Sequence, residues 1–167
     1  MWIPGRCELL RMDDIVIERA ARGYLLRAEA IVPRPIDEVF PFFADAVNLE
    51  RITPPLVKFH VVTPQPIVMR EGLLIDYKLR IRGVPMRWQS EITVWEPQRR
   101  FVDEQRRGPY RFWRHEHRFE ACDGGTRMID EVNYGVPGGA LVNWLVAGRD
   151  VRKIFAYRQQ ALREIFA

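Results

Sequence analysis

The sequence contains little cysteine and no long apolar run. Its 167 residues include two cysteines, Cys7 and Cys122, which lie far apart and form no metal-binding or disulfide pattern. No stretch of about 18 apolar residues occurs, which argues against a transmembrane helix. Residues 1–14 also lack the apolar core of a signal peptide. We therefore expect free thiols, a cytoplasmic location and no integral membrane contact.

Lysine is also scarce, and several catalytic motifs are missing. The net charge of +4 and the isoelectric point near 9.4 come almost wholly from arginine. Many arginines alternate with glutamates at strand positions predicted to face solvent, as in cross-strand charge pairs. No basic cluster free of acids marks a nucleic-acid surface. No nucleophile motif and no Gly-rich phosphate loop occur. We therefore expect no nucleic-acid partner and no cofactor.

Two of the three histidines lie in one stretch, residues 101–135, which is typical of three antiparallel strands. Gly108-Pro109 and Asp123-Gly124-Gly125 are turn signals between runs that alternate in polarity. Successive side chains of a strand point to opposite faces. One face of the middle run therefore collects four large side chains that we expect to face the core: Trp113, His115, His117 and Phe119.

The second turn also predicts the register of the two strands that it joins. With Asp123-Gly124 as a two-residue turn, the opposed pairs are Phe119 with Met128, His117 with Asp130, His115 with Val132 and Trp113 with Tyr134. This register matches apolar residues at three positions and an imidazole with a carboxylate at the fourth. A buried histidine needs such a partner, because a buried polar group without one costs about 1–3 kcal/mol.

The run before Gly108-Pro109 contributes two further polar candidates. Asp103 and Gln105 share a strand face with Phe101, the larger apolar anchor of that run. A two-residue turn would not bring this face to the side of His115. An odd loop or a β-bulge would do so, and on that condition we predict that Asp103 and Gln105 face inward.

The rest of the chain predicts an α+β domain. A strand is expected at residues 23–32, two short helices at 36–43 and 44–51, and strands at 56–63, 72–83 and 86–94. A long helix is expected at residues 140–166, with an apolar stripe at steps of three and four that includes Trp144, Val151, Phe155 and Arg158. Ile15 to Ile17 fits either a short strand or part of an extension. We predict an N-terminal extension over residues 1–22 and one domain over 23–167.

This element order resembles the helix-grip fold of the START-like, Bet v 1-like superfamily, also called SRPBCC. The run Phe101-Val102-Asp103-Glu104-Gln105, Gly108-Pro109-Tyr110, Trp113 and His115-Glu116-His117, followed by Asp130-Glu131-Val132, looks like bacterial ligand-binding SRPBCC domains related to polyketide cyclases and dehydrases. The resemblance implies a curved seven-stranded antiparallel sheet wrapped around a long C-terminal helix. It also implies a mostly apolar cavity between sheet and helix.

The predicted wall of that cavity is rich in aromatic side chains with a few polar groups among them. The candidate ligand-binding residues are Tyr77, Trp88, Asp103, Gln105, Trp113, His115, His117, Asp130, Tyr134, Trp144, Gly148 and Phe155. Gly148 is included because a glycine in the middle of a helix costs about 1 kcal/mol relative to alanine. Its position leaves room for a ligand or for a bulky aromatic of the sheet.

Three interpretations of the histidine pair stay open. Each imidazole could be a hydrogen-bonded structural group, with Asp130 holding His117. The pair could recognise a ligand or transfer protons, so that His115, His117 and Asp130 are the candidate catalytic residues. Two histidines and a carboxylate could also bind a metal ion, although we predict no metal.

Two functional hypotheses follow. The preferred one is a binding protein, a monomer or homodimer, whose partner is a hydrophobic or aromatic small molecule of lipid or polyketide type. The alternative is an enzyme resembling polyketide cyclases or dehydratases that uses His115, His117 and Asp130 for acid–base chemistry. Fold alone does not decide between them.

Overall fold

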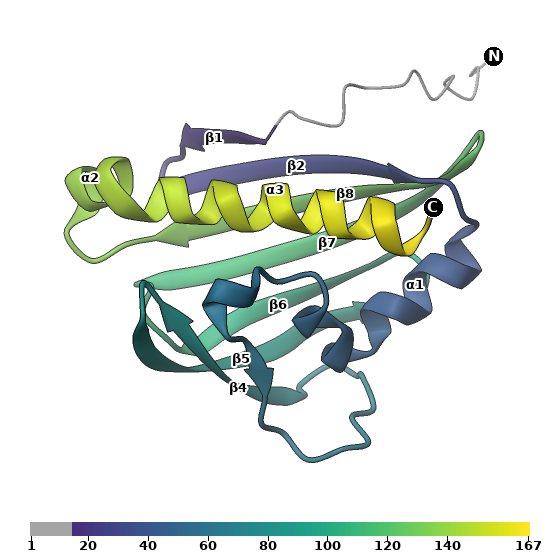
Figure 1. Ribbon diagram of the computed structural model, residues 1–167, viewed down its shortest axis with the longest axis horizontal. Coiled ribbons are helices and arrows are strands. Elements are labelled where there is room, and N and C mark those ends of the chain that lie inside the picture. The colour runs from purple at the N-terminus through teal and green to yellow at the C-terminus, as the bar shows by residue number, and fades with distance from the viewer. Residues whose placement is uncertain (1–14) are drawn as a thin grey trace.

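The computed structural model describes residues 15–167, which form an antiparallel sheet crossed by a long C-terminal helix (Figure 1). The strand order is β1-β2-β8-β7-β6-β5-β4-β3. The strands are β1 (Val16–Arg19), β2 (Tyr24–Val32), β3 (His60–Val61), β4 (Leu74–Ile81), β5 (Val84–Glu96), β6 (Arg100–Arg107), β7 (Phe112–Cys122) and β8 (Gly125–Gly135). The predicted α+β helix-grip fold is therefore confirmed. Cys7, for which a free thiol was expected, lies outside the described residues.

The sheet has eight strands in the described part of the chain, one more than the predicted seven. The additional strand is β1, which pairs with β2 from Val16↔Arg27 to Arg19↔Tyr24. The sequence left open whether Ile15 to Ile17 form a short strand or part of an extension. In the structure, Val16 and Ile17 belong to β1, the edge strand of the sheet. The predicted boundary between an N-terminal extension and the domain, between residues 22 and 23, stays a prediction.

Short helices connect β2 to the second half of the sheet, as predicted. They are α1 (Ile36–Ala44) and the 3₁₀ helix η1 (Ala46–Glu50). The strand predicted at residues 56–63 is wrong over most of its length, because a second 3₁₀ turn, η2 (Pro55–Val57), occupies its start. Lys58 then has φ 45°, which interrupts an extended chain. Extended pairing with β4 is left only to His60 and Val61, and the side chain of His60 is exposed.

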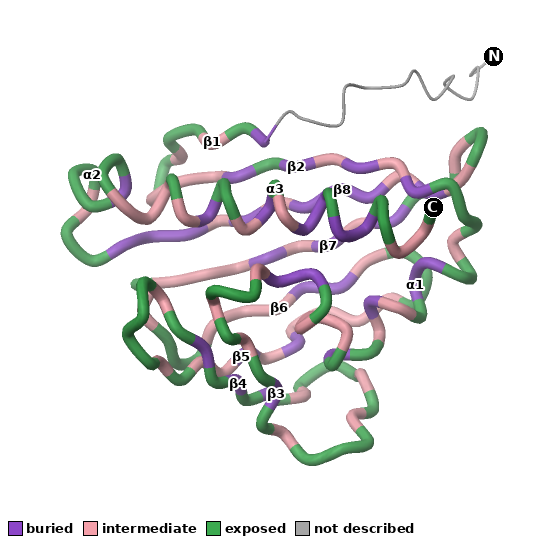
Figure 2. Tube along the Cα trace, viewed as in Figure 1, coloured by how far each residue is buried: buried purple, intermediate pink, exposed green. Residues whose placement is uncertain are grey.

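The central register matches the prediction. His117 lies opposite Asp130 and Phe119 opposite Met128 in the β7–β8 ladder. Asp103 lies opposite His115 in the β6–β7 ladder, so the connection around Gly108-Pro109 is odd in length. Buried and exposed residues alternate along strands such as β4 (Figure 2). Strand alternation and turn length therefore bring Asp103 and both histidines to one face.

The C-terminal helix is interrupted near its start. It consists of α2 (Gly139–Val142), a π-helical turn η3 (Asn143–Ala147) and α3 (Gly148–Ile165). The extra residue of a π turn rotates everything before it by about 100° relative to a continuous α-helix. Asn143 is therefore buried, and Trp144 is 67% exposed instead of joining the stripe of Val151 and Phe155.

One side of helix α3 packs against strands β2 and β8 of the sheet. Val151 and Phe155 contact the cluster that includes Leu26 of β2 and Val132 of β8. Farther along, Leu162 joins Phe40 and other side chains of α1. The helix thus closes over the β2–β8 side of the sheet and faces β4 to β7 across a pocket.

Candidate functional site

A pocket of about 150 Å³ lies between α3, the segment η1–η2 and strands β4 to β7. Its lining is mostly apolar. Four of the predicted aromatic residues line it: Tyr77, Trp88, Trp113 and Phe155. The polar residues Asp103, His115 and His117 line it as well. The structure therefore brings together seven of the predicted site residues.

Five predicted site residues do not line this pocket. Tyr134 is fully buried and donates a hydrogen bond from Oη to Asn143 Oδ1 at 2.9 Å. Burial and the neighbouring Tyr24 raise the pKa of Tyr134 to about 12. Gln105 donates from Nε2 to the carbonyl of Tyr110 at 2.8 Å, so it braces the β6–β7 loop. Asp130 lies behind the histidines and is hydrogen-bonded to His115.

The π turn explains why the other two, Trp144 and Gly148, are outside the pocket. Trp144 faces solvent. A Cβ on Gly148 would lie 2.9 Å from the carbonyl oxygen of Asn143. The space at this glycine is thus filled by the preceding helical turn, and neither a ligand nor a sheet aromatic packs there.

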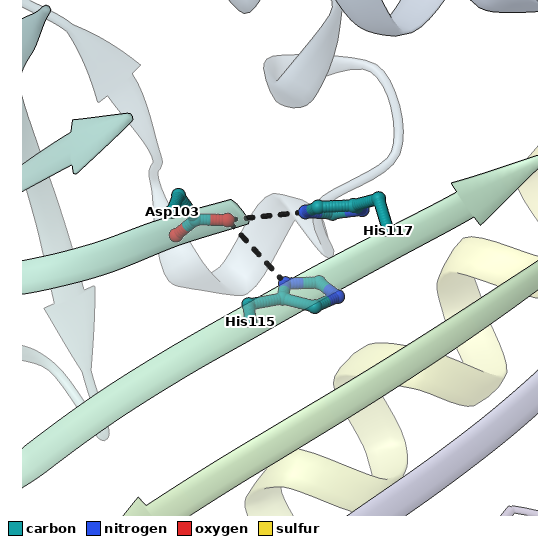
Figure 3. Close-up of side chains that lie close together, drawn as sticks. All are labelled: Asp103, His115 and His117. Atoms are coloured by element: carbon teal, nitrogen blue, oxygen red, sulfur yellow. Dashed lines mark hydrogen bonds and ion pairs between the residues drawn. The ribbon is translucent and has the colours of Figure 1, made fainter. Parts of the chain in front are cut away.

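Asp103 lies beside both imidazoles (Figure 3), and a second carboxylate, Asp130, lies close to the other nitrogen of each ring. His115 Nε2 lies 2.7 Å from Asp130 Oδ1, and His117 Nε2 lies 3.0 Å from Asp103 Oδ2. His117 Nδ1 is also 3.0 Å from Asp130 Oδ1, but it is not aligned for a hydrogen bond. The interpretation in which Asp130 holds His117 thus corresponds to an ion-pair contact without an aligned hydrogen bond, because Asp130 is hydrogen-bonded to His115 and Asp103 to His117.

The cluster separates the protonation behaviour of the two histidines. Burial, together with the charge of His117, lowers the pKa of His115 to about 4. Burial opposes protonation of His117 too, but the hydrogen bond with Asp103 and the negative charges of Asp103 and Asp130 outweigh it and raise that pKa. Burial would raise the pKa of both carboxyls, whereas the histidines lower it, most strongly for Asp130. At neutral pH His115 is therefore neutral, beside two ionised carboxylates.

Arg158 of α3 is a pocket residue that sequence reasoning placed in the apolar stripe. It is 6% exposed, and its guanidinium lies 4.9 Å from the centre of the Phe155 ring. Nη1 is 3.6 Å from Asp130 Oδ1, beyond hydrogen-bond distance. Nε and Nη1 are both buried without a hydrogen-bond acceptor. A charged residue at a core position of the stripe was the signal that could have identified it.

Ser90 and Tyr110 complete the polar part of the lining. Ser90 accepts a hydrogen bond from Trp88 Nε1 at 3.0 Å and donates to Asp103 Oδ1 at 3.4 Å. It thereby holds one carboxylate oxygen and leaves Oδ2 to the histidines. Tyr110 packs on Trp88 and Trp113. Burial raises the pKa of Tyr110, which therefore stays a neutral phenol.

Among residues 15–167, no helix is long and apolar enough to cross a membrane.

Comparisons with known proteins fit this geometry. The sequence model of a family described as polyketide cyclase / dehydrase and lipid transport matches residues 32–159. No curated protein matches significantly. Protein Ms6760 from Mycobacterium smegmatis has a similar structure, with 18% identity, a TM-score of 0.67, and coverage of 90% of this chain and 95% of that chain.

Two further solved structures share the fold. Ara h 8.0201 is 15% identical with a TM-score of 0.64, and the match covers 85% of this chain and 96% of that chain. Major latex-like protein 151 from Panax ginseng is 10% identical with a TM-score of 0.63, and the match covers 86% of this chain and 97% of that chain. Identities this low show a common fold only.

Proposed function

Because the chain belongs to the polyketide cyclase / dehydrase and lipid transport family, within the SRPBCC (Bet v 1-like) superfamily, we propose that it binds a small hydrophobic or aromatic molecule between α3 and strands β4 to β7. The supporting observation is the pocket itself. Aromatic walls surround a few convergent polar groups, which is how small-molecule sites are usually built. Asp103, His115, His117 and Arg158 are those groups.

The volume of the pocket limits the size of the ligand. Ligand pockets commonly measure about 300–1,000 Å³, whereas this one measures about 150 Å³. A dry cavity of about that size holds benzene in another protein. We therefore infer a ligand with about one ring or a short chain, and a larger lipid or polyketide would require the walls to move.

The polar wall indicates one chemical group on that ligand. The buried Nε and Nη1 of Arg158 have no acceptor, and leaving such donors unsatisfied is costly. A carbonyl or carboxylate oxygen in the pocket would satisfy them. The proposed ligand is thus a small apolar compound that carries an oxygen acceptor.

Replacing Arg158 by Met tests this, because methionine keeps most of the volume and removes the donors. Binding of benzoate and of toluene is measured by calorimetry. Hydrogen bonds to charged groups contribute about 1.5–3 kcal/mol, so benzoate affinity should fall by about 10-fold or more while toluene affinity changes little. Arg80→Met on the exposed face of β4 is the control. Failure of both compounds to bind the wild type, or equal losses for both, contradicts the proposal.

The buried histidines favour a second candidate, an enzyme that transfers protons on a bound carbonyl compound. Neutral His115 could accept a proton, and His117, whose pKa is raised, could donate one when it is protonated. His117→Ala separates the two functions. A binder should retain most of its affinity, whereas general acid–base catalysis should lose about 10²–10⁴-fold in rate.

A further inference from the structure

Three donor atoms converge at one point of the pocket wall (Figure 3). Asp103 Oδ2 lies 3.0 Å from His117 Nε2 and 3.7 Å from His115 Nδ1. The donor atoms of the three residues all lie within 4.8 Å of one another. A metal ion held at about 2.0–2.2 Å by nitrogen and oxygen separates its ligand atoms by about 3.0–3.6 Å. Two of the spacings, 3.0 and 3.7 Å, lie close to this range, and the donor atoms of the two histidines, within 4.8 Å of each other, would have to move closer together to hold an ion.

The surroundings orient these donors. His115 Nε2 is hydrogen-bonded to Asp130, which leaves Nδ1 facing Asp103. His117 Nδ1 also faces Asp130 at 3.0 Å, which leaves Nε2 facing Asp103. Metal-binding histidines usually have a carboxylate or carbonyl on their other nitrogen in this way. Asp130 therefore orients His115 through a hydrogen bond and lies close to the other nitrogen of His117 as an ion-pair contact.

Ser90 orients the carboxylate ligand in the same manner. It donates a hydrogen bond to Asp103 Oδ1 at 3.4 Å, so Oδ2 is the oxygen turned toward the two imidazoles. All three donor residues line the pocket. An ion held by them would have its remaining coordination positions on the pocket side, where water or a ligand oxygen could bind.

The charges of the cluster are compatible with a cation. Asp103 and Asp130 contribute two negative charges and Arg158 one positive charge. With both imidazoles neutral, the buried cluster carries one excess negative charge. A divalent ion would turn this into one excess positive charge, which a single anionic ligand would balance. No charged group would then remain uncompensated.

From this geometry we propose that Asp103, His115 and His117 bind a divalent first-row transition-metal ion such as Zn²⁺ or Fe²⁺. Two imidazoles and one carboxylate with open positions are a donor set that suits these ions. Soft thiolate ligands are not involved. The sequence interpretation of a metal site left the carboxylate unnamed, and the structure assigns that place to Asp103. The proposal is independent of any organic ligand.

Titration of the chelator-treated full-length protein with Zn²⁺ in a calorimeter tests the site. One equivalent should bind. Asp103→Asn, which keeps the size of the side chain, and His117→Ala should each reduce affinity by about 100-fold or more. Asp130→Asn should reduce it by about 10–100-fold, the usual effect of losing an orienting partner. His60→Ala removes the exposed third histidine and should bind Zn²⁺ like the wild type.

Co²⁺ provides a measurement on the unaltered chain, which remains informative if a variant fails to fold. Bound Co²⁺ should shift and broaden the ring protons of His115 and His117 and leave those of His60 unaffected. Absence of Zn²⁺ binding to the wild type would overturn the proposal. So would affinity that is unchanged in Asp103→Asn, or Co²⁺ effects centred on His60.

Discussion

At the scale of single residues, Asp130 is the acceptor around which the pocket wall is arranged. Its Oδ1 atom lies 2.7 Å from His115 Nε2, 3.0 Å from His117 Nδ1 and 3.6 Å from Arg158 Nη1. One buried carboxylate oxygen is thus hydrogen-bonded to His115 and lies within ion-pair distance of two further buried nitrogens. Removing a single member of such a buried charged network typically costs about 3–5 kcal/mol, because the remaining charges lose their partner.

The first prediction concerns the protonation of His115 in the metal-free protein. Burial and the charge of His117 lower the pKa of His115 to about 4. An unfolded histidine titrates near about 6.5, so between these values the unfolded chain binds a proton that the folded chain does not. His115 should therefore stay neutral at pH 5–6, which the nitrogen chemical shifts of its ring report. Titration of the ring near the unfolded value would contradict the prediction.

The same difference has a consequence for stability. Since His115 binds fewer protons in the folded state, its contribution makes folding less favourable as pH falls from about 6.5 toward 4. The raised pKa of His117 acts in the opposite sense and stabilises the folded state below the unfolded value. Urea unfolding of His115→Gln should show a smaller loss of stability on acidification than the wild type. His60→Gln is the matched control and should follow the wild type.

The residue types alone did not predict which carboxylate is hydrogen-bonded to which histidine in this cluster. Strand alternation placed Asp103, His115 and His117 on one face, and that is confirmed by their ladder positions. The register also placed His117 opposite Asp130. The hydrogen bonds nevertheless connect Asp130 to His115 and Asp103 to His117. Side-chain rotamers decide these pairings, and they depend on packing that a sequence pattern does not contain.

At the scale of elements, the π turn at Asn143–Ala147 decides which side of the C-terminal helix faces the core. The apolar stripe correctly predicted Val151 and Phe155, which follow the turn. The stripe failed for Trp144, which lies within the turn, because the extra residue changes the phase of the helix. No feature of the sequence indicated the extra residue of the π turn. Asn143, a polar residue, therefore occupies the core position that periodicity had assigned to its neighbour.

The second prediction follows from the hydrogen bond that holds this turn. Tyr134 Oη donates to Asn143 Oδ1 at 2.9 Å in a buried environment. Asn143→Leu leaves the tyrosine hydroxyl without an acceptor and should destabilise the protein by about 1–3 kcal/mol in urea unfolding. Removing both polar groups in Tyr134→Phe with Asn143→Leu should cost less than the sum of the two single changes. Additive losses would mean that this hydrogen bond does not stabilise the turn.

At the scale of the whole molecule, the topology was predictable and the size of the pocket was not. Turn signals and alternating polarity specify an antiparallel meander, and a sheet with one apolar face needs the long helix to cover it. The size of the space left between them depends on how Ile154, Trp88 and their neighbours fill it. Close packing makes that space sensitive to single side chains, so it had to be measured on the structure.

The third prediction uses this sensitivity to test where the ligand binds and how large it is. A pocket of about 150 Å³ should accept benzoate and bind 2-naphthoate more weakly, because the second ring exceeds the available volume. Ile154→Trp fills the pocket from α3 and should abolish benzoate binding. Lys153→Trp adds the same side chain at an exposed neighbouring position and should leave binding unchanged. Tighter binding of 2-naphthoate than of benzoate would instead show that helix α3 and the sheet move apart to enlarge the pocket.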